Sequence, residues 1–166
     1  MNINDRISLA RDFADKAFGE KEYNGQRYIV HCDAVLEVAR RFGHGDNEVI
    51  SLGCILHDTI EDTAITSFEI RELFGDEVGE VVYLVTDKAK HLSRKDRHPL
   101  TYPHIRGHYE ATAVKLSDRI ANCEVGSKND MYRKEHKYFK NTLYIPGEHE
   151  EMWEHLNSLL STRNTY

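Results

Sequence analysis

The sequence predicts an all-α protein, a compact orthogonal bundle of about seven or eight helices. Apolar residues recur at the i, i+3, i+4 spacing of amphipathic helices along most of the chain, which is the main signal for helix. The alternation typical of strands is absent, apart from a short β-branched patch near Val81. A length of 166 residues without an internal repeat or a Pro/Gly-rich linker indicates one domain, which we expect to span residues 1–166.

The apolar stripes define the helices one by one. In chain order we expect helices over residues 7–18, 31–42, 47–58, 67–74, 78–85, 111–125, 132–145 and 148–160. Gly19, Gly43 and Gly75 follow the first, second and fourth of these, as expected where helices end. Ser67 and Asp76 are the expected N-caps of the fourth and fifth.

Two segments between the helices read as irregular. Residues 21–27 form a short polar loop, and residues 86–103 form a longer one that contains Pro99 and Pro103. The longer segment is rich in lysine and arginine. We interpret it either as a flap that binds phosphate groups or as a solvated mobile loop.

Composition excludes several classes of protein. The net charge of −6 argues against a general nucleic-acid binder. No apolar stretch approaches the roughly 20 residues that cross a bilayer, and residues 1–11 lack the apolar core of a secretory signal. Cys32, Cys54 and Cys123 have no CxxC spacing, so we expect reduced core thiols in a cytoplasmic protein.

The most informative segment is residues 57–63, with the sequence HDTIEDT. If the helix continues through it, Glu61 lies one turn beyond His57 and Asp62 one turn beyond Asp58. Four side chains that bind cations or transfer protons then converge at one helix end. The alternative is a helix C-terminus with solvated acids. Such residues are rarely buried together unless a metal ion or a substrate compensates their charge.

Two further polar residues lie on apolar helix stripes and are therefore expected to face inward. His31 shares a stripe with Val35 and Val38, and the alternative to a metal ligand is a core histidine bonded to a backbone carbonyl. Asp118 lies on the stripe of residues 114–125, where a buried carboxylate requires a cation. Lys115, one turn earlier, is the alternative partner to a metal ion.

Together, His31, His57, Asp58 and Asp118 supply two imidazoles and two carboxylates. This mixed donor set predicts a divalent ion with more than four ligands, with Mn²⁺ preferred and Fe²⁺, Mg²⁺ or Zn²⁺ as alternatives. Such an ion lowers the pKa of water, which can then attack phosphorus. Glu61 and Asp62 would be the catalytic pair that orients and deprotonates this water.

The sequence resembles the HD phosphohydrolase superfamily, and within it the hydrolase domain of the RelA/SpoT homologues. The similarity covers about residues 5–125 and lies in the segments 27–31 (RYIVH), 57–63 (HDTIEDT), 74–78 (FGDEV), 85–87 (VTD) and 114–122 (VKLSDRIAN). No room exists for a synthetase domain, so the chain looks like a stand-alone small alarmone hydrolase.

The resemblance implies the HD-domain fold and hydrolysis of the 3′-pyrophosphate of (p)ppGpp to GDP or GTP and pyrophosphate, with a small nucleotide as partner. It implies that His31, His57, Asp58 and Asp118 hold Mn²⁺ and that Glu61 and Asp62 activate water. Asn122 should contact the nucleotide, unless it is a plain surface amide.

The chain departs from the family pattern where positive charge is usual. Lys21 stands alone where the family has an Arg-Lys pair, Cys32 replaces a proline, and Glu124 replaces an arginine. Lys88, Lys90 and Arg94 in the basic segment are therefore further candidates for substrate binding, with Lys21.

These departures leave other interpretations open. A phosphatase for (p)ppApp, NADPH or a nucleoside monophosphate would keep the metal site and change the substrate. A non-catalytic nucleotide-binding module would keep the fold, although the retention of Glu61 and Asp62 argues against it. His104 and His108 have a spacing that suits a second metal, but an ordinary i, i+4 pair is the preferred interpretation. The sequence does not predict an oligomeric state.

Overall fold

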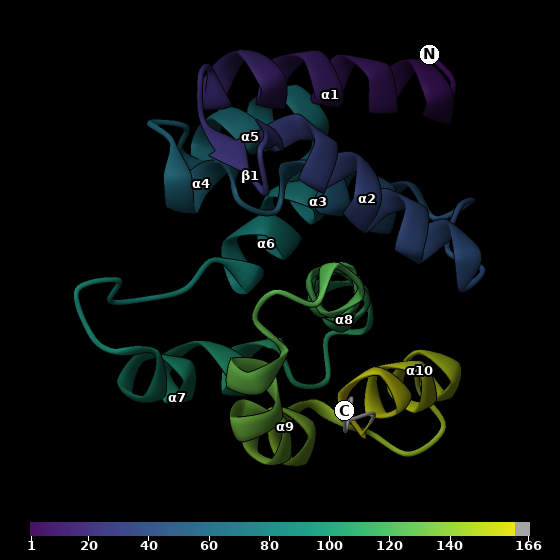
Figure 1. The fold of residues 1–166 in the computed structure, drawn as a ribbon. Helices are drawn as coiled ribbons and strands as arrows, with labels where there is room; N and C mark the ends of the chain where they lie inside the picture. The colour runs from purple at the N-terminus through teal and green to yellow at the C-terminus, as the bar shows by residue number, and fades with distance from the viewer. Residues whose placement is uncertain (162–166) are drawn as a thin grey trace.

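The computed structural model describes residues 1–161 and confirms an all-α architecture (Figure 1). Its helices and strands are α1 (Ile3–Phe18), β1 (Glu22–Tyr23), β2 (Gln26–Arg27), α2 (Tyr28–Arg41), α3 (Glu48–Leu56), α4 (Thr59–Asp62), α5 (Ser67–Phe74), α6 (Asp76–Val85), α7 (Arg94–Ile105), α8 (Tyr109–Val125), α9 (Asn129–Leu143) and α10 (Glu150–Ser161). Among these residues, no helix combines the length and apolar composition needed to cross a bilayer.

Helix α3 lies at the centre of the bundle, where it packs against α1, α2, α6 and α8. Ile50, Leu52, Ile55 and Leu56 are fully buried, which explains its almost continuous apolar sequence. A side chain at Gly53 would lie 2.9 Å from a methyl group of Val114 and 3.1 Å from one of Val81. The glycine therefore lets α8 and α6 approach α3 closely, and this approach brings the end of α3 beside α8.

The expected helix over residues 47–58 ends earlier than predicted, at Leu56, and α4 begins at Thr59. Local hydrogen bonds explain the break. The Thr59 hydroxyl donates to the Leu56 carbonyl at 2.7 Å, and Nδ1 of His57 lies 2.8 Å from the Cys54 carbonyl oxygen. These side chains satisfy carbonyls that a helix end leaves unpaired. His57 and Asp58 therefore join α3 to α4, and α4 contains Glu61 and Asp62.

The prediction of an irregular segment over residues 86–103 is wrong in its second half, because α7 begins at Arg94. Ser93 caps this helix by accepting a hydrogen bond from the Asp96 amide. Pro99 and Pro103 lie four residues apart on its exposed side. The buried residues Tyr102 and Ile105 anchor the other side, so tertiary packing outweighs the low helix propensity of proline.

Three smaller predictions also differ from the structure. Thr66, not Ser67, caps α5, where it forms a reciprocal capping box with Glu69. Gly75, not Asp76, is the N-cap residue of α6, and no side chain caps that helix. The loop of residues 21–27 contains a two-stranded antiparallel hairpin, whose turn residues Asn24 and Gly25 both have positive φ.

Candidate active site

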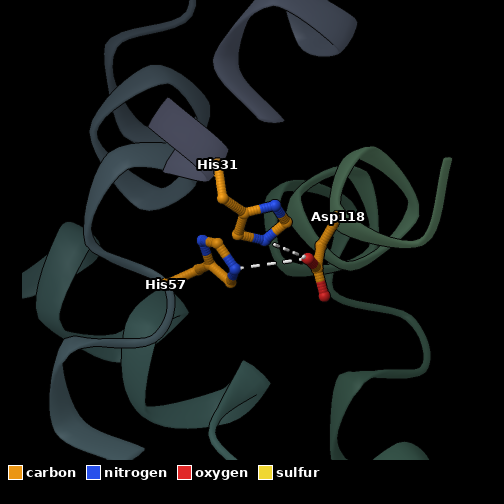
Figure 2. A group of neighbouring side chains, drawn as sticks. All are labelled: His31, His57 and Asp118. Atoms are coloured by element: carbon orange, nitrogen blue, oxygen red, sulfur yellow. Dashed lines mark hydrogen bonds and ion pairs between the residues drawn. The ribbon is translucent and has the colours of Figure 1, made fainter. Parts of the chain in front are cut away.

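Side chains from three helices meet at the centre of the bundle (Figure 2). His31 lies on α2, His57 follows α3, and Asp118 lies on α8. Nε2 of His31 is 3.0 Å from Oδ1 of Asp118, and Nε2 of His57 is 3.3 Å from the same oxygen. One potential ligand atom from each residue lies within 4.8 Å of the other two. Neither the core-histidine alternative for His31 nor the Lys115 alternative for Asp118 describes these contacts.

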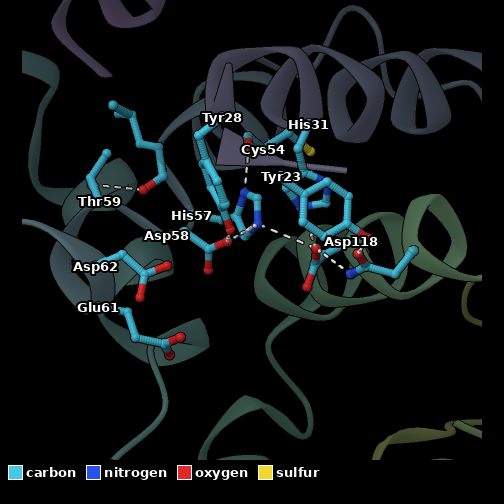
Figure 3. Close-up of polar contacts among 12 residues, drawn as sticks. Tyr23, Tyr28, His31, Cys54, His57, Asp58, Thr59, Glu61, Asp62 and Asp118 are labelled. Carbon is cyan, nitrogen blue, oxygen red and sulfur yellow. Dashed lines mark hydrogen bonds and ion pairs between the residues drawn. The ribbon is translucent and has the colours of Figure 1, made fainter. Parts of the chain in front are cut away.

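Asp58 joins this group from the other side of His57. Its Oδ2 lies 2.9 Å from Nε2 of His57 and also accepts a hydrogen bond from the Tyr28 hydroxyl. Asp58, Glu61 and Asp62 form a second set whose carboxylate oxygens lie within 4.8 Å of one another (Figure 3). The structure therefore brings all six predicted metal and catalytic residues together at one site.

The chemistry of this group fits a divalent metal ion. Nδ1 of His57 faces the Cys54 carbonyl and carries the proton in the neutral ring, which leaves the lone pair of Nε2 facing two carboxylates. Nε2 is buried and makes no well-directed hydrogen bond. Burial disfavours the charged imidazole, but Asp58 and Asp118 outweigh it and raise the pKa of His57 well above its usual value. A cation at this position would take over the role of that proton.

Glu61 and Asp62 lie beside this group and differ in their surroundings. Oε1 of Glu61 accepts a hydrogen bond of 2.8 Å from the Asp87 amide. Burial, followed by the charge of Asp58, raises the pKa of Glu61, which makes it a stronger base than an exposed glutamate. Asp62 is held by the ammonium groups of Lys90 at 2.7 Å and Lys21 at 3.4 Å.

A pocket of about 330 Å³ opens over these residues. His57, Asp58 and Asp118 line it together with Glu61 and Asp62. The lining also contains the basic residues Arg94, Arg97, Lys115, Arg119 and Lys128. A pocket that combines a metal-type group with several cations suits a small molecule that carries several phosphate groups.

The predicted substrate contacts differ in their placement. Lys21, Asn122 and Arg94 line the pocket. Nδ2 of Asn122 donates to Asp118 at 3.0 Å and its Oδ1 accepts from Tyr23 at 2.5 Å, so Asn122 is not a plain surface amide. Lys90 reaches the site through Asp62.

Lys88, by contrast, points away from the pocket. Its ammonium donates to the Tyr83 carbonyl at 2.6 Å and lies 3.8 Å from the centre of the Tyr83 ring. The structure therefore does not support Lys88 as a substrate contact. His104 and His108 likewise do not form a ligand group within residues 1–161. Nδ1 of His108 instead accepts a hydrogen bond from the Ala111 amide and caps α8.

The sequence interpretation missed several residues of the pocket. Tyr23 packs on the His31 ring at 4.6 Å between centroids, because the hairpin folds over α2. Arg119 supplies positive charge from α8, whereas Arg97 of α7 belongs to the basic segment that the sequence already indicated as a possible phosphate-binding flap. Glu124 was expected to reduce the charge near the substrate, but it pairs with Arg41 and His155 outside the pocket. For the pocket residues that were missed on α8, the usable signal in the sequence was helix periodicity, which places Lys115 near Asp118.

A helical bundle with a His/Asp group at its centre defines an all-α domain of the HD type. The family model described as HD domain matches residues 8–102, and the chain belongs to this family. The matched part contains His31, His57 and Asp58, whereas Asp118 lies beyond it.

Similar proteins include guanosine-3′,5′-bis(diphosphate) 3′-pyrophosphohydrolases from several organisms. The one from Aquifex aeolicus is 37% identical over 128 residues, which is 72% of this chain and 18% of the relative. The one from Danio rerio is 32% identical over 104 residues, which is 61% of this chain and 57% of the relative. The chain thus spans less than two thirds of the length of each of these proteins.

Solved structures support the fold. The structure of a metazoan SpoT orthologue, described as hydrolysing ppGpp, has a TM-score of 0.77 and 21% identity, with 93% of each chain covered. A protein of Listeria monocytogenes has a TM-score of 0.61 and 27% identity over 80% of this chain and 99% of its own. The first likeness extends the HD-domain fold over nearly the whole chain.

Proposed function

We propose that this protein is a Mn²⁺-dependent hydrolase that removes the 3′-pyrophosphate of (p)ppGpp. The observation that carries the proposal is the convergence of His31, His57 and Asp118 beside Asp58, Glu61 and Asp62, in a pocket that basic residues also line. The activity named for the relatives from Aquifex aeolicus and Danio rerio supports the substrate.

In this proposal His31, His57, Asp58 and Asp118 hold the metal ion. A bound divalent ion supplies positive charge that polarises a phosphoryl oxygen and makes water more acidic. Mn²⁺ is preferred over Fe²⁺, Mg²⁺ and Zn²⁺ because the donors are both nitrogen and oxygen. Tyr28 and the Cys54 carbonyl orient Asp58 and His57 for this role.

Glu61 and Asp62 would act on the attacking water. Glu61, with its raised pKa, accepts the water proton, and Asp62 orients the water. The water oxygen forms a bond to the phosphorus next to the ribose, the bond from this phosphorus to the 3′-oxygen breaks, and that oxygen takes up a proton. The products are GDP or GTP and pyrophosphate.

We further propose that residues 1–166 act as one catalytic domain in the cytoplasm, with a small nucleotide as partner in place of nucleic acid or membrane. Cys32, Cys54 and Cys123 are free and buried, which agrees with a reducing compartment. The net charge of −6 argues against binding to nucleic acid.

Product analysis with the full chain tests the proposed reaction. The protein is stripped with a chelator, reloaded separately with Mn²⁺, Fe²⁺, Mg²⁺ or Zn²⁺, and incubated with ppGpp, ppApp, NADPH and nucleoside monophosphates. We expect GDP and pyrophosphate from ppGpp, no activity after stripping, and the best recovery with Mn²⁺. Release of orthophosphate alone would support the phosphatase alternative. A metal-loaded protein that binds ppGpp but does not cleave it would be a nucleotide-binding module.

A further inference from the structure

Most cations of the pocket already have an acidic partner. Guanidinium and ammonium groups around the pocket form ion pairs that compensate their charge and fix their positions. These pairs are Arg94–Glu135 at 2.7 Å, Arg119–Glu135 at 3.5 Å, Arg97–Asp87 at 3.0 Å and Lys21–Asp62 at 3.4 Å. A substrate anion would have to compete with these carboxylates for each of the four cations.

Lys115 is different. Its side chain lines the pocket and is half-buried, yet its ammonium has neither an ion pair nor a hydrogen bond within residues 1–161. Its ammonium lies 5.7 Å from the centre of the Tyr102 ring. Lys128 also lacks such a partner among these residues, but it is exposed and therefore solvated.

The ammonium of Lys115 keeps its charge in this position. Burial alone lowers the pKa of a lysine, but the surroundings, chiefly Tyr102, Asp87 and Asp118, raise the pKa of Lys115 above its usual value. Removing a charged group from water without a close partner is costly. Lys115 is thus a charged donor in the pocket wall that is available to an anion. His98, which also lines the pocket, adds no charge because burial lowers its pKa to about 4.

The position of Lys115 relative to the metal group indicates which kind of anion it would bind. Lys115 precedes Asp118 by three residues on α8, so both side chains lie on the same face of the helix, with Cβ atoms about 5–6 Å apart. A phosphate held by a metal ion at Asp118 and the two histidines would leave Lys115 free for the next phosphate of a chain. A substrate with a single phosphate at this position has no second phosphate to offer to Lys115.

We propose that Lys115 binds the terminal phosphate of the 3′-diphosphate and so makes the site specific for a 3′-diphosphate over a 3′-monophosphate. The inference rests on the proposed function, because it assumes that the phosphorus next to the ribose lies at the metal group. The bond between the two phosphates stays intact, and the phosphate on Lys115 leaves as part of pyrophosphate. Lys115 thereby decides that pyrophosphate, rather than orthophosphate, is released.

The test compares Lys115→Met and Lys115→Arg with the wild type on two nucleotides, ppGpp and guanosine 5′-diphosphate 3′-monophosphate. Loss of one charge-assisted hydrogen bond should lower kcat/KM for ppGpp by about 10- to 100-fold in Lys115→Met. The value for the 3′-monophosphate should not change, and Lys115→Arg should keep most of the preference. Lys137→Met, which removes an exposed lysine outside the pocket, is the matched control.

Binding to the Mn²⁺-loaded proteins gives a second measurement that does not depend on turnover. Calorimetry with inorganic pyrophosphate and with orthophosphate should show weaker pyrophosphate binding in Lys115→Met and equal orthophosphate binding. An equal loss for both anions, or no loss for either, would contradict the role of Lys115. If the wild type cleaves no ppGpp, the proposed function fails, while the calorimetry still decides whether Lys115 selects a diphosphate.

Discussion

One carboxylate oxygen organises the site at the scale of single residues. Oδ1 of Asp118 lies 3.0 Å from His31 and 3.3 Å from His57, and it accepts a hydrogen bond of 3.0 Å from Asn122. The contacts from His31 and His57 (Figure 2), together with the hydrogen bond from Asn122, keep this oxygen in one place. The burial of both histidines limits their rotamers and fixes the geometry further. The proposed metal group is therefore preorganised before any ligand binds.

The assigned roles of Glu61 and Asp62 give a prediction at this scale. Glu61→Gln and Asp62→Asn keep the shape of each side chain but remove its ability to accept a proton. We expect each to lower kcat by about 100-fold or more. Metal content, measured by elemental analysis, should stay at the wild-type level because the four proposed ligands are untouched. Wild-type turnover in both variants would remove the role that we assign to these acids.

At the scale of elements, α9 holds two basic residues of the pocket in place through its acidic residue Glu135. Glu135 on α9 forms a bidentate pair with Arg94 of α7, at 2.7 and 3.0 Å, and lies 3.5 Å from Arg119 of α8. Arg119 also donates to the Tyr102 hydroxyl at 3.1 Å. One carboxylate thus connects three helices and keeps two guanidinium groups beside the pocket.

Glu135→Gln tests this connection. The variant leaves two guanidinium groups without their acid partner, one of them almost fully buried, so we expect the free energy of unfolding to fall by about 1–3 kcal/mol. Chemical denaturation of the metal-free protein measures the change. Glu151→Gln on the exposed side of α10 is the matched control and should alter stability by less than about 0.5 kcal/mol. Equal free energies of unfolding for Glu135→Gln and Glu151→Gln would show that the ion pairs of Glu135 contribute little to stability.

At the scale of the whole molecule, the site lies where the two parts of the chain meet. The part of the chain from α1 to α6 contains His31, His57, Glu61 and Asp62. The part from α7 to α9 contains Asp118 and most of the basic residues that line the pocket (Figure 1). Packing of α8 against α2 and α3 joins the two parts. A ligand that binds His31, His57 and Asp118 at once must therefore stabilise the complete fold.

This arrangement predicts that metal binding and folding are linked. Mn²⁺ at 100 times its Kd should raise the free energy of unfolding by about 2.7 kcal/mol, since the unfolded chain lacks the assembled ligands. Thermal unfolding with and without Mn²⁺ measures the shift in Tm. Asp118→Asn should lose most of the shift, and Lys137→Met should keep it. A Tm that does not respond to any of the four candidate metals would count against a metal site at this place.

The sequence by itself determined the helical class and most of the site. Apolar periodicity located eight of the helices because it depends on residues within one or two turns. The same periodicity predicted that His31 and Asp118 face inward, and the motif HDTIEDT contains the other four predicted metal and catalytic residues. These features are local, so a single stretch of sequence is enough to recognise them.

The tertiary structure decided what depends on partners far away in the chain. The His31–Asp118 contact spans 87 positions and the Arg94–Glu135 pair spans 41, and no local pattern specifies either. Helix α7 forms despite two prolines because Tyr102 and Ile105 are buried against the rest of the molecule. The sequence predicted Lys88 as a substrate contact and Lys115 only as an alternative partner of Asp118, but packing directs Lys115 into the pocket and Lys88 away from it. Burial and charge pairing are properties of the assembled fold, and they single out the lysine available to a phosphate.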